Sequence, residues 1–551
     1  MLPKEGRMTR FTIAMRSVFL WVFLLCCSGG YAGSSPNVPV DDYVYRDIDK
    51  LVAAGLIKDA IYAQRPWSRN EIARMIAGAR ERLAGQSERG GISMAAEEIL
   101  KRLEGEYRHE LAGTETVYFK PLEKAALGFA FMDSPFREVR PDNGLAYIKT
   151  SVNPLVSYME GRPFADGSAL TIETSHSAAL SRYFSVYAAP RFDFLDARNG
   201  PTNVQARIQA LYGKASLGNI EMEVGRDSLI WGHGEYGGVL ASNNARNLDM
   251  VKLSNDSPFV HPSVFKYLGP SKYTFFIARL GSYFDPNNGY LYGFSASYKP
   301  FPFLEIGVKH QINVGGDDIP DVGLGQKIRE LFFFRGEPYG VQETMDNREG
   351  FDVRVQIPQL RNAVVYTEGI FEDFGRDSFW PQFTEMMGFS SGVYFPLLTA
   401  DGSNDLRIEY EHNPAAYGRH FMYVSGLSLD DRLRGSELGP DGKGFHVIWR
   451  RSFRSTAQFR GEAHYEDRGN DLYTQRPSPN GADKVIKLTD NPKEHRFRLV
   501  SSLDWKLGAG MTVRPIFGYE RVGNYDFEDG VGRNNFLGAI SIRWTRCGNS
   551  D

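Results

Sequence analysis

Residues 456–466 read TAQFRGEAHYE and carry the clearest signal of the architecture. Two sets of side chains interleave along this stretch, one apolar or small and one polar: Ala457, Phe459, Gly461, Ala463 and Tyr465 against Gln458, Arg460, Glu462, His464 and Glu466. Because successive side chains of a β-strand point to opposite faces, this alternation predicts a strand with one apolar face and one wet, fully charged face.

The same two-residue period runs from about residue 124 to the end of the chain. Residues 290–299 place aromatic rings on one face and small or charged residues on the other, and residues 406–411 (LRIEYE) alternate in the same way. Turn-rich segments such as 285–289 (DPNNG) and 439–444 (GPDGKG) lie between the predicted strands. The chain is therefore predicted to be mostly β.

Two architectures fit such strands. A soluble sandwich or propeller buries the apolar faces, whereas an outer-membrane barrel turns them toward lipid. Strands near 10 residues, aromatic residues near strand ends and charged wet faces favour the barrel. We predict a large antiparallel outer-membrane β-barrel over residues 124–544, of about 16 to 18 strands. A short C-terminal tail, residues 545–551, departs from the terminal aromatic with which such barrels commonly end.

The N-terminus has the features of a secretory signal peptide. Four basic residues precede or adjoin an apolar run of 10 residues from Val18 to Cys27. A membrane-spanning helix needs roughly 20 apolar residues, so a membrane anchor is the less favoured alternative. Small residues precede Gly33, and we predict a signal peptide over residues 1–32 with cleavage after Ala32. Lipidation at Cys26 or Cys27 is a further, less favoured alternative.

In residues 33–123 the apolar residues recur at helical spacing rather than at every second position. Ser68 and Glu71 have the spacing of a capping box at the start of a helix, and Trp67 with Ile72 has that of a hydrophobic staple. Helices before and after this one complete a small bundle, which we place in the periplasm. The stretch also resembles a single S-layer-homology unit. That resemblance would imply cell-wall binding, but a structural plug or docking bundle is the preferred interpretation.

Composition excludes several classes of protein. The chain has 64 Lys and Arg against 67 Asp and Glu, so it lacks the basic excess of a nucleic-acid binder. Three cysteines cannot form a disulfide scaffold. His233 has no second histidine at ligand spacing, and the sequence shows no phosphate-binding loop, so we expect no metal and no cofactor.

Residues 225–255, GRDSLIWGHGEYGGVLASNNARNLDMVKLSN, resemble the signature region of the Wzi-type capsule assembly family. The resemblance continues through residues 267–270, 347–355, 407–411 and 438–441 and covers most of the mature chain. It implies an outer-membrane barrel of about 18 strands with a periplasmic helical bundle. The implied role is that of a surface lectin that holds or organises capsular or other extracellular polysaccharide, without a known catalytic residue set.

The same segment supplies the candidate binding residues. Aromatic rings can stack on a pyranose face, while amides, carboxylates and guanidinium groups bond its hydroxyls. The candidates are Trp231 and Tyr236 for stacking, with Glu235, Asn243, Asn244 and Arg246 for hydrogen bonds. A purely structural loop folded into the barrel is the competing interpretation. Two other aromatic segments, residues 332–340 and 374–383, are alternative candidates for sugar binding. Their aromatic residues can equally be interpreted as part of the girdle at the membrane interface.

Charged pairs lie on the wet faces, such as Arg407 with Glu409 and Arg460 with Glu462. They fit either the lining of a sugar track or pore, or a network that neutralises itself inside the lumen. Catalysis is disfavoured because Ser228 lacks a nucleophile elbow.

The sequence thus predicts a non-enzymatic protein of a Gram-negative outer membrane that binds surface polysaccharide and assists capsule or exopolysaccharide assembly or attachment. Its expected partners are that polysaccharide and outer-membrane lipid, with export machinery as a further candidate. The alternatives are a porin or glycan transporter and a glycan-modifying enzyme.

Overall fold

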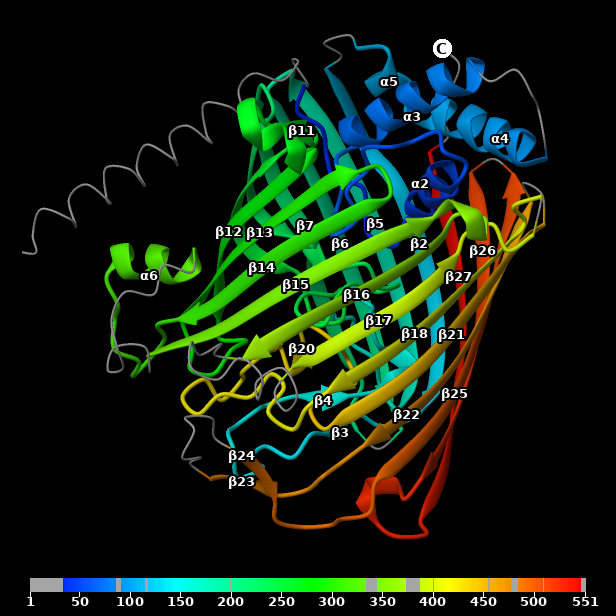
Figure 1. Cartoon of the computed structure of the whole chain (residues 1–551). Coiled ribbons are helices and arrows are strands. Elements are labelled where there is room, and N and C mark those ends of the chain that lie inside the picture. Colours follow the sequence, from blue (N-terminus) through cyan, green and yellow to red (C-terminus); the bar gives the residue numbers. More distant parts are fainter. Residues whose placement is uncertain are drawn as a thin grey trace, which may run out of the picture.

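The computed structural model describes residues 33–85, 91–113, 117–198, 200–332, 344–372, 387–399, 401–453, 456–476, 484–508 and 510–546. The predicted signal peptide and residues 547–551 of the tail lie outside these residues. Within them, eighteen long antiparallel strands and the two-residue strand β11 (Phe259–Val260) form one closed barrel (Figure 1). The predicted β-barrel is therefore confirmed, with the strand number at the upper end of the expected range.

The barrel strands begin earlier than predicted, at Tyr118, and end at Thr545. In chain order they are β2 (Tyr118–Asp133), β5 (Gly167–Ser181), β6 (Phe184–Ala197), β7 (Asn203–Leu217), β8 (Ile220–Asp227), β10 (Leu248–Asn255), β12 (Pro270–Gly281), β13 (Gly289–Phe301), β14 (Leu304–Val314), β15 (Met345–Ile357), β16 (Ala363–Glu372), β17 (Gly388–Phe395), β18 (Asn404–Asn413), β21 (Gly442–Phe453), β22 (Ala457–Arg468), β25 (Glu494–Gly508), β26 (Met511–Gly523) and β27 (Gly532–Thr545). β2 pairs with β27 from Lys124↔Thr545 to Asp133↔Phe536, which closes the sheet.

The two faces of the strands have the polarity of a membrane barrel. Apolar side chains point outward and stay exposed, as Phe445 (47%) and Tyr465 (49%) show on β21 and β22. Charged side chains of the same strands point inward and are buried, as Arg450 and Glu466 show, each 1% exposed. A soluble protein would bury the apolar set instead, so this pattern identifies the outer surface as the lipid-facing one.

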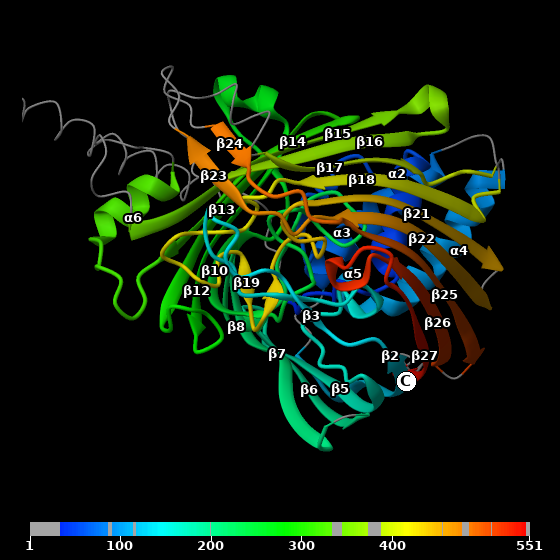
Figure 2. The same cartoon turned by 90° about the horizontal axis from the view of Figure 1, so that it is seen from below.

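The two ends of the barrel differ. At one end, the turn end, strands are joined by short turns such as residues 182–183 and 218–219. At the other, the loop end, most of the connections are longer. Three of them, residues 134–166, 228–247 and 414–441, fold back into the barrel, and we call them the plug. Figure 2 shows these connections crossing the barrel opening.

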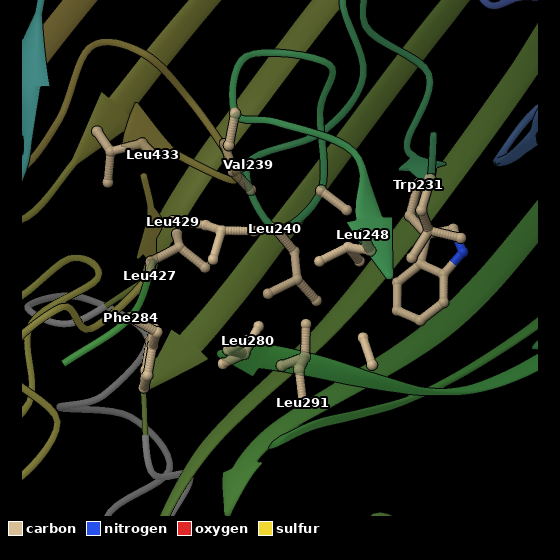
Figure 3. Close-up of a cluster of buried hydrophobic side chains, with 14 of the residues drawn as sticks. Trp231, Val239, Leu240, Leu248, Leu280, Phe284, Leu291, Leu427, Leu429 and Leu433 are labelled. Atoms are coloured by element: carbon tan, nitrogen blue, oxygen red, sulfur yellow. The ribbon is translucent and has the colours of Figure 1, made fainter. Parts of the chain in front are cut away.

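Backbone hydrogen bonds join the three parts of the plug. Glu160 donates to Asn243 O (2.6 Å) and Ser242 donates to Arg434 O (2.7 Å). The plug also has an apolar core against the inner wall, in which Leu240, Leu427 and Leu429 lie together (Figure 3). It is therefore a packed part of the fold rather than a set of surface loops.

The N-terminal helices cover the turn end (Figure 1). They are α2 (Val44–Ala53), α3 (Arg69–Ala84), α4 (Gly91–Glu106) and α5 (Arg108–Leu111). The connection from α2 to α3 reaches into the lumen, where strand β1 (Gln64–Arg65) pairs with strand β9 (Ile230–Trp231) of the plug. None of the described helices is long and apolar enough to cross a membrane.

The predicted capping box of α3 is half formed. Ser68 Oγ accepts the backbone N–H of Glu71 at 2.9 Å, as expected for an N-cap. The carboxylate of Glu71 turns away from the cap, because it forms a buried ion pair with Lys272 on β12. The residue that would complete a local cap instead holds the bundle against the barrel wall.

Replacing Glu71 by Ala should loosen the bundle from the barrel, because the buried Lys272 ammonium would lose its partner at a cost of about 3 to 5 kcal/mol. We expect limited proteolysis of the full-length chain to cleave within the bundle faster than in the wild type. Glu81→Ala, an exposed position on the same helix, is the matched control. Equal cleavage rates for the two variants would contradict this role of Glu71.

Candidate functional site

Residues 228–247 bring the candidate polar residues into the lumen. Their backbone passes so close to β16 that a Cβ added at Gly232 or Gly238 would lie 2.4 Å from Glu368 Oε2. Glu368 accepts the N–H of Val239 and pairs with Lys309 at 2.9 Å. Glycine at these positions therefore lets the loop reach a buried carboxylate that holds it in place.

Glu235 is the electrostatic centre of this loop. Its carboxylate contacts arginines from three neighbouring strands, Arg407 (3.3 Å), Arg450 and Arg460 (2.8 Å). Burial alone would raise the pKa of Glu235, but the three guanidinium groups hold that pKa well below its ordinary range. Glu235 therefore stays ionised and binds the plug to the wall.

Tyr236 joins the same network through its hydroxyl and its ring. The hydroxyl donates to Glu462 at 2.5 Å, and the ring stacks on Tyr158 with centroids 4.4 Å apart and planes at 3°. Arg460 in turn bonds Glu462 at 2.8 Å. The charged pairs of the wet faces thus form a network that neutralises itself within the lumen, the second of the two interpretations drawn from the sequence.

A cavity of about 380 Å³ lies on the turn-end side of this network. Glu235, Tyr236 and Asn243 line it, and Tyr158 lines it together with Glu160, whose pKa burial raises to about 7. It shares lining residues with a larger cavity of about 1380 Å³ beneath the helices. On the loop-end side the same tyrosines border a void of only about 20 Å³. The lumen space therefore narrows abruptly at the plug.

Trp231 does not fit the expected role of a sugar platform. Its side chain lies among the buried apolar residues at the inner wall (Figure 3). It is 0% exposed and packs on Phe276 with ring centroids 5.5 Å apart. The pairing of β9 with β1 holds its backbone against the N-terminal segment inside the lumen. The sequence could not distinguish this core position from a surface one, because burial of the ring depends on the inward path of the loop.

The two predicted asparagines have different surroundings. Asn244 donates to Leu433 O and accepts the N–H of Tyr158, both at 3.0 Å, and so links all three parts of the plug. Asn243 lines the cavity of about 380 Å³. For Asn244 the structural interpretation is therefore the better supported one.

Arg246 is the one predicted residue that reaches the loop-end surface. Its guanidinium lies 3.5 Å from the ring centroid of Tyr283, and that tyrosine is 46% exposed. The backbone of Asp430 donates to Tyr283 O at 2.9 Å. Two further exposed aromatic residues, Tyr147 (42%) and Phe421 (52%), lie on plug segments that pair backbone to backbone between Tyr147 and His420.

We call Tyr147, Arg246, Tyr283, Phe421 and Asp430 the outer loop face. The sequence did not single out its aromatic residues, because they stand alone in turn-rich segments. Of the alternative aromatic segments, residues 333–340 and 374–383 lie outside the described residues.

The acidic residues and the histidine of the signature do not converge on one reactive centre in the described part of the chain. His233 Nε2 lies 2.9 Å from Asp352 on β15. Asp249 pairs with Arg226 at 2.7 Å, and the side chain of Asp249 is 46% exposed. Glu235 is engaged by arginines, as described above. This arrangement gives no support to a nucleophile activated by a base.

Comparisons with known proteins agree with this architecture. The sequence model of a family described as "Capsule assembly protein Wzi" matches residues 149–537. No match is found among curated proteins.

Among solved structures, Wzi of Escherichia coli, described as a carbohydrate-binding β-barrel and an outer-membrane protein involved in group 1 capsule assembly, superposes with a TM-score of 0.64. It is 13% identical, with 93% of this chain and 99% of that chain covered. OccD3 (OpdP) of Pseudomonas aeruginosa is more distant, with a TM-score of 0.42, 11% identity and coverage of 78% and 94%.

Replacing Glu235 by Gln should lower the free energy of unfolding by about 3 to 5 kcal/mol at pH 7, because two buried arginines and the half-buried Arg460 lose their shared carboxylate. The unfolded pKa of a glutamate is about 4.3 and the folded pKa lies below it, so the difference from wild type should persist at pH 5 and shrink only as the pH falls below about 4.

Urea unfolding of the protein in lipid vesicles measures this difference. Glu138→Gln, at an exposed position, should match the wild type at each pH. If Glu235→Gln and the wild type already have the same free energy of unfolding at pH 5, the arginines do not stabilise the ionised carboxylate.

Proposed function

Because the chain belongs to the capsule assembly protein Wzi family, we propose that it is an outer-membrane barrel that binds surface polysaccharide and assists its assembly or attachment without catalysis. The observation that carries the proposal is the family match over residues 149–537, on a barrel whose lumen is crossed by the plug. A lumen that a packed plug crosses fits a binding protein better than a conduit.

We propose that the turn end faces the periplasm and the loop end faces the cell exterior. Bacterial outer-membrane barrels have short periplasmic turns and long extracellular loops, and this chain has the same asymmetry. The helical bundle covers the turn end, where export machinery would be within its reach. The plug and the outer loop face would then lie on the side where capsule is held.

The outer loop face has the chemistry that a sugar polymer needs. Exposed aromatic rings offer apolar platforms for pyranose faces, and Tyr283 is held in place by the Arg246 guanidinium. Asp430, which pairs with Arg207 at 3.3 Å, adds a charged hydrogen-bonding group beside it. We therefore place polysaccharide binding here rather than at Trp231.

A glycan transporter is the second candidate function, and the cavity of about 1380 Å³ beneath the helices favours it. The plug counts against it, because Glu235 and Tyr236 are bonded to the wall between that space and the loop end.

The wild-type protein in planar bilayers should therefore show no sustained current steps, whereas a general porin reconstituted in the same membranes conducts. Stable ohmic steps from the purified wild-type protein would overturn the sealed-barrel account and favour the transporter.

Calorimetric titration of the source cell's purified surface polysaccharide into the detergent-solubilised protein should give saturable binding without new reducing ends. Tyr283→Ala should weaken binding by about 1 kcal/mol, about fivefold in Kd, because a stacking ring is lost. Tyr183→Ala is the matched control, since Tyr183 is similarly exposed (42%) but lies in a turn at the opposite end.

Absence of saturable binding by the wild type would contradict the binding function. Equal losses of affinity in Tyr283→Ala and Tyr183→Ala would contradict binding at the outer loop face. Release of new reducing ends would contradict a non-catalytic role.

A further inference from the structure

Two histidines face each other across neighbouring strands inside the barrel. His446 on β21 is the register partner of His464 on β22, and their Nδ1 atoms lie 2.7 Å apart. Glu466 follows two residues later on the same inward face of β22. One ligand atom from each of these three residues lies within 4.8 Å of the others.

This spacing is close to that of a metal-binding pair. Two imidazole nitrogens that bind one tetrahedral ion at 2.0–2.1 Å lie about 3.3 Å apart. A small opening of the pair would therefore admit an ion. The competing arrangement is a single N–H···N hydrogen bond between neutral rings, which uses the same atoms without an ion.

A second observation concerns the void of about 20 Å³ next to the pair, which is lined by both histidines, Glu411 and Glu437. A space of that size holds one water molecule or one ion. Glu437 is 4% exposed, and its Oε2 has no hydrogen-bond partner in the described part of the protein. An unpartnered buried carboxylate oxygen is costly unless something else binds it.

Ion pairs surround the two histidines on the inner face of the barrel. Arg498 is shared between Glu466 (3.1 Å) and Glu437 (3.4 Å), and Arg496 contacts Glu466 at 3.0 Å. Glu411 accepts the Ser436 hydroxyl at 2.7 Å, and among the described residues it forms no ion pair.

We propose that His446, His464 and Glu466 bind a late first-row divalent cation of the Zn²⁺ type, with the Glu437 carboxylate beside it. Imidazole and carboxylate donors together suit such ions. Because Glu437 belongs to the plug and the other three groups belong to the wall, the ion would hold the plug against β21 and β22. A search for histidine spacing along the chain misses this site, since strand register rather than sequence distance brings the ligands together.

The test uses the full-length mature protein without a histidine tag, stripped with a chelator in detergent and titrated with ZnCl₂ by calorimetry. Wild type should bind one Zn²⁺ per chain, with the stoichiometry confirmed by elemental analysis. His446→Gln and His464→Gln should bind at least about tenfold more weakly. His495→Gln is the control, because His495 is a partly exposed histidine (side chain 47%) paired with Asp467 on a neighbouring strand, and it should bind like the wild type.

Two readouts keep the result independent of variant folding. Zn²⁺ should raise the Tm of the wild type, because it binds the folded state only. Glu437→Gln, which leaves the histidine pair intact, should reduce both the affinity and that Tm shift. The proposal is overturned if stripped wild type binds no Zn²⁺, or if His464→Gln with a wild-type circular dichroism spectrum binds as tightly as the wild type.

Discussion

Pairing between β2 and β27 is the constraint on which the rest of the structure depends. Inside a bilayer an unpaired strand edge has no water to satisfy its N–H and C=O groups, so the sheet must close on itself. The register from Lys124↔Thr545 to Asp133↔Phe536 achieves this closure. Closure then divides every strand into a lipid face and a lumen face, and it encloses the charged side chains within one space.

Those enclosed charges explain the plug. Arginines and carboxylates from many strands cannot stay buried without partners, and the inward connections supply them. Glu235 serves three wall arginines, while Glu368 of the wall receives the backbone of the loop at Val239. The signature segment is therefore mainly a structural element. Among the described residues, the loop end presents exposed aromatic and charged side chains that include Tyr283 and Arg246.

Periodicity made most of the architecture predictable. The alternation at residues 456–466 gave strand β22, and Ser68 marked the N-cap of α3, because both signals depend on local geometry. The roles of Trp231 and Glu71 could not be predicted, since each depends on a partner far away in the sequence: Phe276 and Lys272, respectively. The His446–His464 pair could not be predicted for the same reason, because only the register of two neighbouring strands brings the two residues together.

Cysteine labelling on intact cells tests the central claim, that the barrel presents its loop end to the cell surface and its helical bundle to the periplasm. A single cysteine at Asp318, exposed in the connection between β14 and β15, and another at Lys101, exposed on α4, would each be placed in an otherwise cysteine-free chain. A membrane-impermeant maleimide should label position 318 in intact cells and position 101 only after the outer membrane is permeabilised. Labelling of position 101 alone in intact cells would contradict the account.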